Sequence, residues 1–143
     1  MVETLAMTGR SKGVGGREFR VTDVRVYRPY PDEVPWELLD QPVAADAEVE
    51  GMQMRIAKLG DDVVGAYVIE PIDPLTFRIV DLVVAEGWRR RGIGRWLLGH
   101  AIGLAESRGA REVLVADPSP RRFFACIGFV EAGAGMRFHI TPE

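Results

Sequence analysis

The chain has 143 residues, of which 47% are hydrophobic and 27% charged, values typical of one globular domain with a sizeable core. Its formal net charge of −3 does not support nucleic-acid binding, and no apolar run approaches the roughly 20 residues of a membrane span. The single cysteine, Cys126, excludes an internal disulfide framework and a cysteine-rich zinc site. We therefore expect a cytoplasmic protein without nucleic-acid or membrane partners.

The beginning of the chain predicts a tail followed by one domain. Residues 1–18 are rich in Gly, Ser, Lys and Arg and lack the apolar stretch of a secretory signal, so we expect a flexible tail before a single domain at 19–143. Residues 19–28 alternate apolar and polar side chains, which predicts a half-buried strand. Prolines near both ends of 34–44 indicate a short helix there.

The middle of the chain predicts three strands. Residues 51–60 and 63–70 alternate on either side of a Gly-Asp-Asp turn, which is typical of a hairpin. The Pro-Ile-Asp-Pro sequence at 71–74 is expected to end the strand before it and separate it from the next strand. Residues 75–85 are more continuously apolar, as in a strand that is covered on both faces.

The last third predicts alternating helices and strands. Apolar residues at helical spacing indicate a buried helix over 92–108, followed by a strand over 111–117. A short helix is expected over 118–128, and final strands over 129–133 and 136–142. The first of these helices should form a parallel crossover between the strands on its two sides.

Arginines and glycines gather where the long helix begins. Glycine is a poor helix residue, but its missing Cβ lets the backbone approach a ligand closely. The unpaired N–H groups and positive dipole of a helix start favour a phosphate. This segment is therefore interpreted as a diphosphate-binding loop. It is neither a Walker loop, for which the Gly-Lys-Ser/Thr sequence is missing, nor a dinucleotide fingerprint, for which the third glycine is missing.

The segment "RRRGIG" resembles the [Q/R]-x-x-G-x-[G/A] signature of the GNAT N-acetyltransferases, with Arg89, Gly92 and Gly94 at its fixed positions. "FFACIGF" at 123–129 is similar to the family's later F-Y-E-x-x-G-F segment, and the resemblance covers roughly 19–141. It implies an α/β (α+β) GNAT-type fold. Such a fold has a mixed, mostly antiparallel sheet of about six or seven strands with a parallel splayed pair, flanked by about three to four helices.

The resemblance also implies a cofactor and its contacts. Acetyl-CoA would be the acyl donor, with pantetheine amides pairing with the free backbone of a splayed strand at Leu82, Val83 and Val84. The diphosphate would be held by backbone N–H groups of the signature loop, in which the implied binding residues are Arg89, Arg90, Arg91, Gly92, Ile93, Gly94 and Arg95.

One residue departs from the family pattern. Many members carry a tyrosine that protonates the departing thiolate, and the corresponding residue here is Phe124, which has no proton to give. Another group, or water, must then supply the proton, or activity is reduced. Cys126 lies nearby in sequence, and the favoured interpretation is a small buried apolar residue.

Amine acylation needs a proton acceptor, because a lysine-like amine is mostly protonated at neutral pH. Asp81 is the first candidate, since burial beside the cofactor strand would raise its pKa; a purely structural carboxylate is an equal alternative. Asp117 is second, although a helix cap or turn before Pro118 is the favoured role. Glu70 is a candidate for attracting a cationic acceptor; the alternative is an ordinary exposed residue at the end of a strand. The N–H of Val83 is a candidate donor to the thioester oxygen.

The remaining candidates are weaker. His139 could line the acceptor site but suits a solvated strand position, and His100 suits a packed, hydrogen-bonded residue, so no metal site is expected. Trp88 and Trp96 are expected to pack around the loop. Arg121 and Arg122 are candidates for solvated charges at a helix start or for contacts to the cofactor's 3′-phosphate.

The leading hypothesis is an acetyl-CoA-dependent N-acetyltransferase acting on a small-molecule or peptide amine by direct attack. The alternative is an acyl-CoA-binding regulatory or interaction protein on the same fold, with weakened catalysis. A binder of another phosphate ligand, such as a nucleotide, is third. An exposed edge strand near the C-terminus permits a homodimer.

Overall fold

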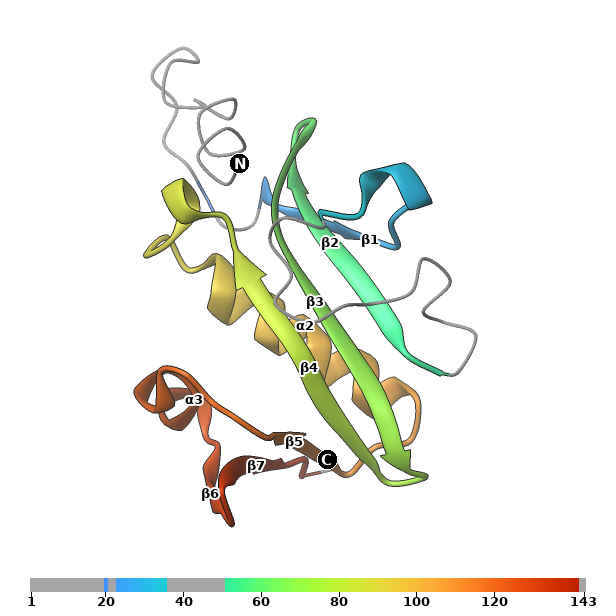
Figure 1. Ribbon diagram of the computed structural model, residues 1–143, viewed down its shortest axis with the longest axis vertical. Helices are drawn as coiled ribbons and strands as arrows, with labels where there is room; N and C mark the ends of the chain where they lie inside the picture. Colours follow the sequence, from blue (N-terminus) through green and yellow to red (C-terminus); the bar gives the residue numbers. More distant parts are fainter. Residues whose placement is uncertain (1–19, 21–22, 36–50, 142–143) are drawn as a thin grey trace.

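The computed structural model describes residues 20, 23–35 and 51–141. They form a seven-stranded mixed sheet in the order β1-β2-β3-β4-β5-β7-β6 (Figure 1). The strands are β1 (Arg25–Tyr27), β2 (Gln53–Leu59), β3 (Asp62–Asp73), β4 (Thr76–Val84), β5 (Glu112–Val115), β6 (Val130–Ala132) and β7 (Gly135–His139). The helices are α2 (Ile93–Ser107) and α3 (Arg121–Ile127), with 3-10 turns η3 (Pro31–Glu33) and η5 (Glu86–Trp88).

The predicted fold class is confirmed. The β2–β3 hairpin forms, and α2 connects β4 to β5 in the only parallel pairing that joins the described strands. The described residues contain two α-helices, fewer than the three to four expected. The tail expected at 1–18, and all but the first two residues of the helix expected at 34–44, lie outside the described residues.

The break predicted at 71–74 is wrong, because β3 continues through Pro71 and turns only at residues 74–75. The register explains why a proline is tolerated there. The pairing of β2 with β3 reaches Ile69 and no further, so Pro71 pairs with β4 alone and lies on an open edge of β3. Proline lacks a backbone N–H, and an edge is where a strand can accommodate it.

Helix α2 packs along β3 and β4 (Figure 1). The helix buries Ile93, Leu97, Leu98, Ala101 and Ala105. Burying a side chain such as Leu97 stabilises the fold by about 1.5–3 kcal/mol. The approach of helix and sheet requires Gly65 in β3, since a Cβ there would lie 2.8 Å from both Leu97 Cδ1 and the Val83 carbonyl oxygen.

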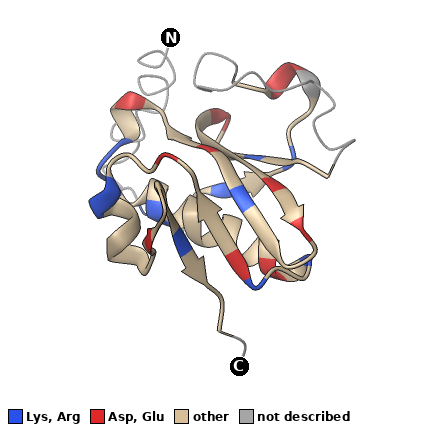
Figure 2. Cartoon of the chain, turned by 60° about the horizontal axis from the view of Figure 1, so that its bottom comes forward, with Lys and Arg blue, Asp and Glu red and all other residues tan. Residues whose placement is uncertain are grey.

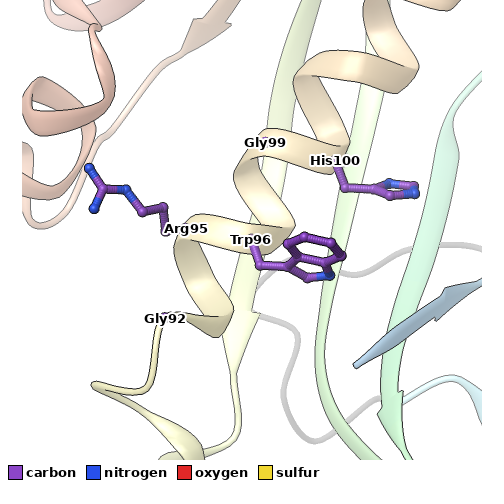
Figure 3. A pocket seen from close by; sticks show the side chains of 5 residues that line it. All are labelled: Gly92, Arg95, Trp96, Gly99 and His100. Atoms are coloured by element: carbon purple, nitrogen blue, oxygen red, sulfur yellow. The ribbon is translucent and has the colours of Figure 1, made fainter. Parts of the chain in front are cut away.

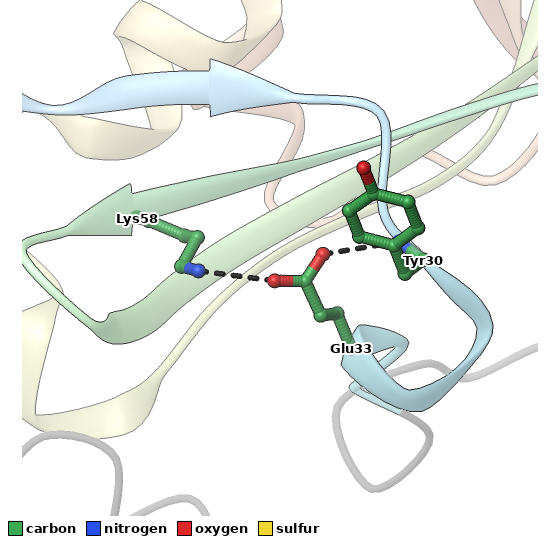
Figure 4. A network of polar contacts seen from close by, with 3 residues as sticks. All are labelled: Tyr30, Glu33 and Lys58. Atoms are coloured by element: carbon green, nitrogen blue, oxygen red, sulfur yellow. Dashed lines mark hydrogen bonds and ion pairs between the residues drawn. The ribbon is translucent and has the colours of Figure 1, made fainter.

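A polar contact attaches η3 to the sheet. The Glu33 carboxylate accepts hydrogen bonds from the Tyr30 N–H at 3.0 Å and from Lys58 Nζ at 3.1 Å (Figure 4). The amide donor, and then the ammonium group, lower the pKa of Glu33. This contact fixes the connection that follows β1 against β2.

Candidate active site

The centre of the sheet is bent where β4 leaves β5. On one side of β4, Ile69 pairs with Ile79 while Val68 pairs with Asp81, so one extra residue, Val80, forms a bulge. On the other side, pairing with β5 ends at Ile79. A bulge bends its strand and increases the local twist. After the bulge, the last four residues of β4 therefore pair with β3 alone and border a gap that opens beyond the end of β5.

The ladder determines which backbone groups face this gap. Ala85 donates its N–H to Val64 O at 2.8 Å, and these two residues continue the register of β3 and β4. Hydrogen-bonded pairs alternate along an antiparallel ladder. Val83 therefore shares its amide with β3, which excludes it as the donor expected from the sequence. The backbone groups of Leu82 and Val84 point to the other edge, into the gap.

The signature loop leads from the end of β4 into α2. Gly92 is the N-cap of α2 in the left-handed region, with φ of 87°, and its carbonyl oxygen accepts from the Trp96 N–H at 3.0 Å. No side chain caps this helix start. The first amides of α2 thus retain donor capacity, and the helix dipole adds positive potential. Arg90 is also left-handed, with φ of 65°.

The signature arginines have different surroundings. Arg89 donates from Nε to the Val84 carbonyl oxygen at 3.0 Å, so its side chain holds the loop to β4. The Arg91 guanidinium lies 5.0 Å from the ring centre of Trp88, which is buried as expected. Arg95 is exposed on α2. Positive charge therefore gathers around the helix start, where an anion would be stabilised.

Asp81 is the buried carboxylate beside the gap. Its exposed fraction is 6%, and Oδ1 accepts the Leu82 N–H at 3.0 Å. Tyr67 reaches α2, so its neighbour Val68 faces the opposite side of the sheet, and Asp81 pairs with Val68. Cross-strand partners share a face. The Asp81 side chain consequently lies on the face opposite α2.

The other candidate carboxylates have different positions. Asp117 is exposed beyond the end of β5, and it does not cap α3, whose N-cap is Pro120. Glu70 forms an ion pair with Arg78 across β3 and β4, so its charge is compensated. Acidic and basic positions are interspersed along the strands in this way (Figure 2).

Helix α3 packs beside the loop through its aromatic residues. Phe124 is 5% exposed and packs edge to face with Phe123 and Phe129, at centroid distances of 5.1 and 5.4 Å. The expectation of a buried Cys126 is wrong: its thiol is exposed, because the short helix turns this position away from the core. Arg121 contacts Glu131 and the Ala134 carbonyl oxygen, so it is partnered within the chain.

The exposed side of α2 carries a groove of about 450 Å³, lined by Gly92, Arg95, Trp96, Gly99 and His100 (Figure 3). Trp96 is 38% exposed, so the packing role expected for it is wrong.

His100 makes the hydrogen bond expected of it, with Nδ1 2.7 Å from Tyr67 Oη. Partial burial, and then the charge of Arg55, lower the pKa of His100. Burial also raises the pKa of Tyr67, which keeps its hydroxyl protonated. No local pattern in the sequence indicated Tyr67, since it lies 33 residues before its partner.

His139 lies exposed on β7, away from His100 on α2. Within the described residues, no group of three or more His, Cys, Asp or Glu could hold a metal ion. In the same part of the chain, no helix is long and apolar enough to cross a membrane.

Strand β4, which leaves β5 after Ile79, leads through η5 and the signature loop to the uncapped start of α2. The model of the acetyltransferase (GNAT) family matches residues 18–129. The chain belongs to this family. A search of curated proteins found no match to the sequence.

Solved structures share the fold at low sequence identity. A GNAT family acetyltransferase from Elizabethkingia anophelis with acetyl-CoA bound is 16% identical, with a TM-score of 0.69 over 82% of this chain and 99% of its own. An IAA acetyltransferase from Bacillus cereus ATCC 14579 is 23% identical, with a TM-score of 0.64 over 82% and 98%. N-acetylglutamate synthase from Neisseria gonorrhoeae, complexed with coenzyme A and N-acetyl-glutamate, is 15% identical, with a TM-score of 0.71 over 88% and 36%.

Proposed function

We propose that the protein transfers an acetyl group from acetyl-CoA to a primary amine of a small molecule or peptide. The observation that carries this proposal is the continuity of two binding elements. The open edge of β4 ends at Val84, and the helix start at Gly92 follows after one short loop. A pantetheine arm needs amide partners in an extended groove, and a diphosphate needs several N–H donors at its end.

The residues of both elements fit this donor. Leu82 and Val84 direct backbone groups into the gap, where the Leu82 carbonyl oxygen and the Val84 N–H can pair with pantetheine amides. Gly92 has open space where a Cβ would lie, so backbone can approach phosphate oxygens there. In this proposal the amides of residues 90–95 hold the diphosphate, while Arg90, Arg91 and Arg95 add positive charge.

The chemistry requires proton removal from the amine. Asp81 is the buried carboxylate at the gap, and we assign it the role of proton acceptor. The neutral amine nitrogen then bonds to the thioester carbonyl carbon, and the carbon–sulfur bond breaks. The second proton that the nitrogen loses passes through water to the departing thiolate, which leaves as the thiol. Asp117, exposed beyond β5, is the second candidate acceptor.

Phe124 supports a second candidate function. Its buried ring supplies no proton, so an acyl-CoA-binding regulatory protein with weakened catalysis is the alternative. A cytoplasmic location and a homodimer stay predictions.

Two measurements test the proposal. In a thermal-shift series, acetyl-CoA and coenzyme A should raise the unfolding midpoint; stabilisation by ATP alone would contradict coenzyme A binding. Thiol release from acetyl-CoA should then depend on the amine in a panel of amino acids, polyamines, aminoglycosides and peptides. Tight coenzyme A binding without turnover on any amine would favour the regulatory alternative.

A further inference from the structure

The N–H of Leu82 lies within reach of two hydrogen-bond acceptors, one in the protein and one in a bound donor. The alternation of the β3–β4 ladder directs this N–H into the gap, where a bound thioester would lie. In the protein alone the same N–H donates to Asp81 Oδ1 at 3.0 Å. One N–H cannot make a full hydrogen bond to a carboxylate and to a thioester carbonyl oxygen at the same time.

We infer that the Asp81 carboxylate and the acyl oxygen of the donor compete for the Leu82 N–H. This inference rests on the proposed function, and it adds a regulation of that site. In the empty site Asp81 caps the Leu82 amide, so this donor is not left without an acceptor. When acetyl-CoA binds, its carbonyl oxygen takes the amide and displaces the carboxylate.

The exchange prepares the proton acceptor only when the acyl donor is present. A carboxylate that loses an N–H donor holds its negative charge less well and becomes a stronger base. The Asp81 side chain lies on the face opposite α2, so the carboxylate stays on that side of the sheet when it no longer accepts from the Leu82 N–H. An amine approaching from this face meets an active base after the donor has bound. Deprotonation of the amine by Asp81 therefore follows binding of the donor.

The first test compares two ligands that differ in the carbonyl group alone: acetyl-CoA and its thioether analogue S-ethyl-CoA. Because the competition acts only against a carbonyl oxygen, Asp81→Ala should tighten acetyl-CoA binding about fivefold relative to S-ethyl-CoA, the size of one hydrogen bond. Asp81→Asn keeps an oxygen acceptor, so its ratio of dissociation constants should change less. Calorimetric titration of all three proteins measures these ratios. An Asp81→Ala ratio equal to that of the unmodified protein would overturn the inference.

A second measurement uses the unmodified protein and does not depend on the folding of a variant. In the free protein, and with S-ethyl-CoA bound, the Leu82 amide proton resonance should shift as a carboxyl group titrates. With acetyl-CoA bound, this pH dependence should become clearly weaker, because the carboxylate no longer accepts the Leu82 N–H. Retention of the same dependence with acetyl-CoA would overturn the competition. If neither ligand binds at all, the proposed function itself fails, so the two failures are distinguishable.

Discussion

Arg89 donates a hydrogen bond from Nε to the carbonyl oxygen of Val84 at 3.0 Å, which joins the first signature arginine to the last residue of β4. Because the Val84 carbonyl group faces the gap, the Arg89 side chain is held at the end of that gap. The arginine at this position therefore acts on loop geometry as well as on charge.

Replacing Arg89 should weaken coenzyme A binding more than it lowers stability. We expect Arg89→Ala to raise the dissociation constant about fivefold, because the loop loses its attachment to β4. The unfolding midpoint should change little, since the lost bond is exposed. Arg89→Lys should recover part of the affinity. The control is Arg111→Ala, because Arg111 is also exposed but lies beside Leu75, at the far end of β4. Unchanged affinity in Arg89→Ala would contradict this role.

The two signature glycines should respond differently to alanine. Gly92 has φ of 87°, where a side chain costs about 1–2 kcal/mol, so Gly92→Ala should distort the loop and weaken coenzyme A binding about tenfold. A Cβ at Gly94 would lie 3.5 Å from Phe123 and 3.7 Å from Val84, which are ordinary contacts. Gly94→Ala should therefore keep its affinity within about twofold. Equal losses in the two variants, measured by calorimetry, would be inconsistent with this explanation.

Phe124→Tyr tests the missing general acid. The ring is buried beside Phe123 and Phe129. A tyrosine hydroxyl at this position would therefore lose its hydrogen bonds to water, and the two phenylalanine rings offer no replacement. We expect the free energy of unfolding to fall by about 1–2 kcal/mol, with no gain in turnover. Chemical denaturation and a thiol-release assay measure the two effects. A tenfold rise in turnover at unchanged stability would show that this position does reach the thiolate.

The Tyr67–His100 contact predicts a pH dependence of stability. Partial burial lowers the pKa of His100 below its ordinary value of 6.5, so the unfolded chain takes up this proton first as the pH falls. The contribution of neutral His100 to the free energy of unfolding is therefore complete above about pH 6.5 and decreases below that pH. His100→Asn keeps an acceptor for the Tyr67 hydroxyl but does not titrate. Its unfolding midpoint should therefore fall less between about pH 7 and 5, and parallel curves would contradict the prediction.

The exposed thiol of Cys126 makes a direct prediction about the folded state. It is the only cysteine in the chain, so one equivalent should react with an aromatic disulfide reagent in the native protein, without denaturant. A thiol that reacts only after unfolding would mean that this side of α3 is covered.

Local patterns in the sequence predicted the elements that depend on local spacing. The apolar spacing of 92–108 gave the helix Ile93–Ser107, and the turn residues at 60–62 gave the β2–β3 hairpin. The bulge at Val80 was not predicted, because it is a property of the pairing between β3 and β4. The sequence also could not show that Leu82, and not Val83, points its N–H into the gap, because this follows from the hydrogen-bonding register of β3 and β4. The exposure of Cys126 and Trp96 depends on how short or one-sided helices pack, which residue type alone does not reveal.

The central claim is that the backbone at the start of α2 holds the diphosphate of coenzyme A. A crystal structure of the protein with coenzyme A tests it most directly. We expect diphosphate oxygens within hydrogen-bond distance of amides between Arg90 and Arg95, with the pantetheine arm along Leu82 and Val84. A diphosphate bound elsewhere, without contact to the backbone from Gly92 to Arg95, would contradict the account.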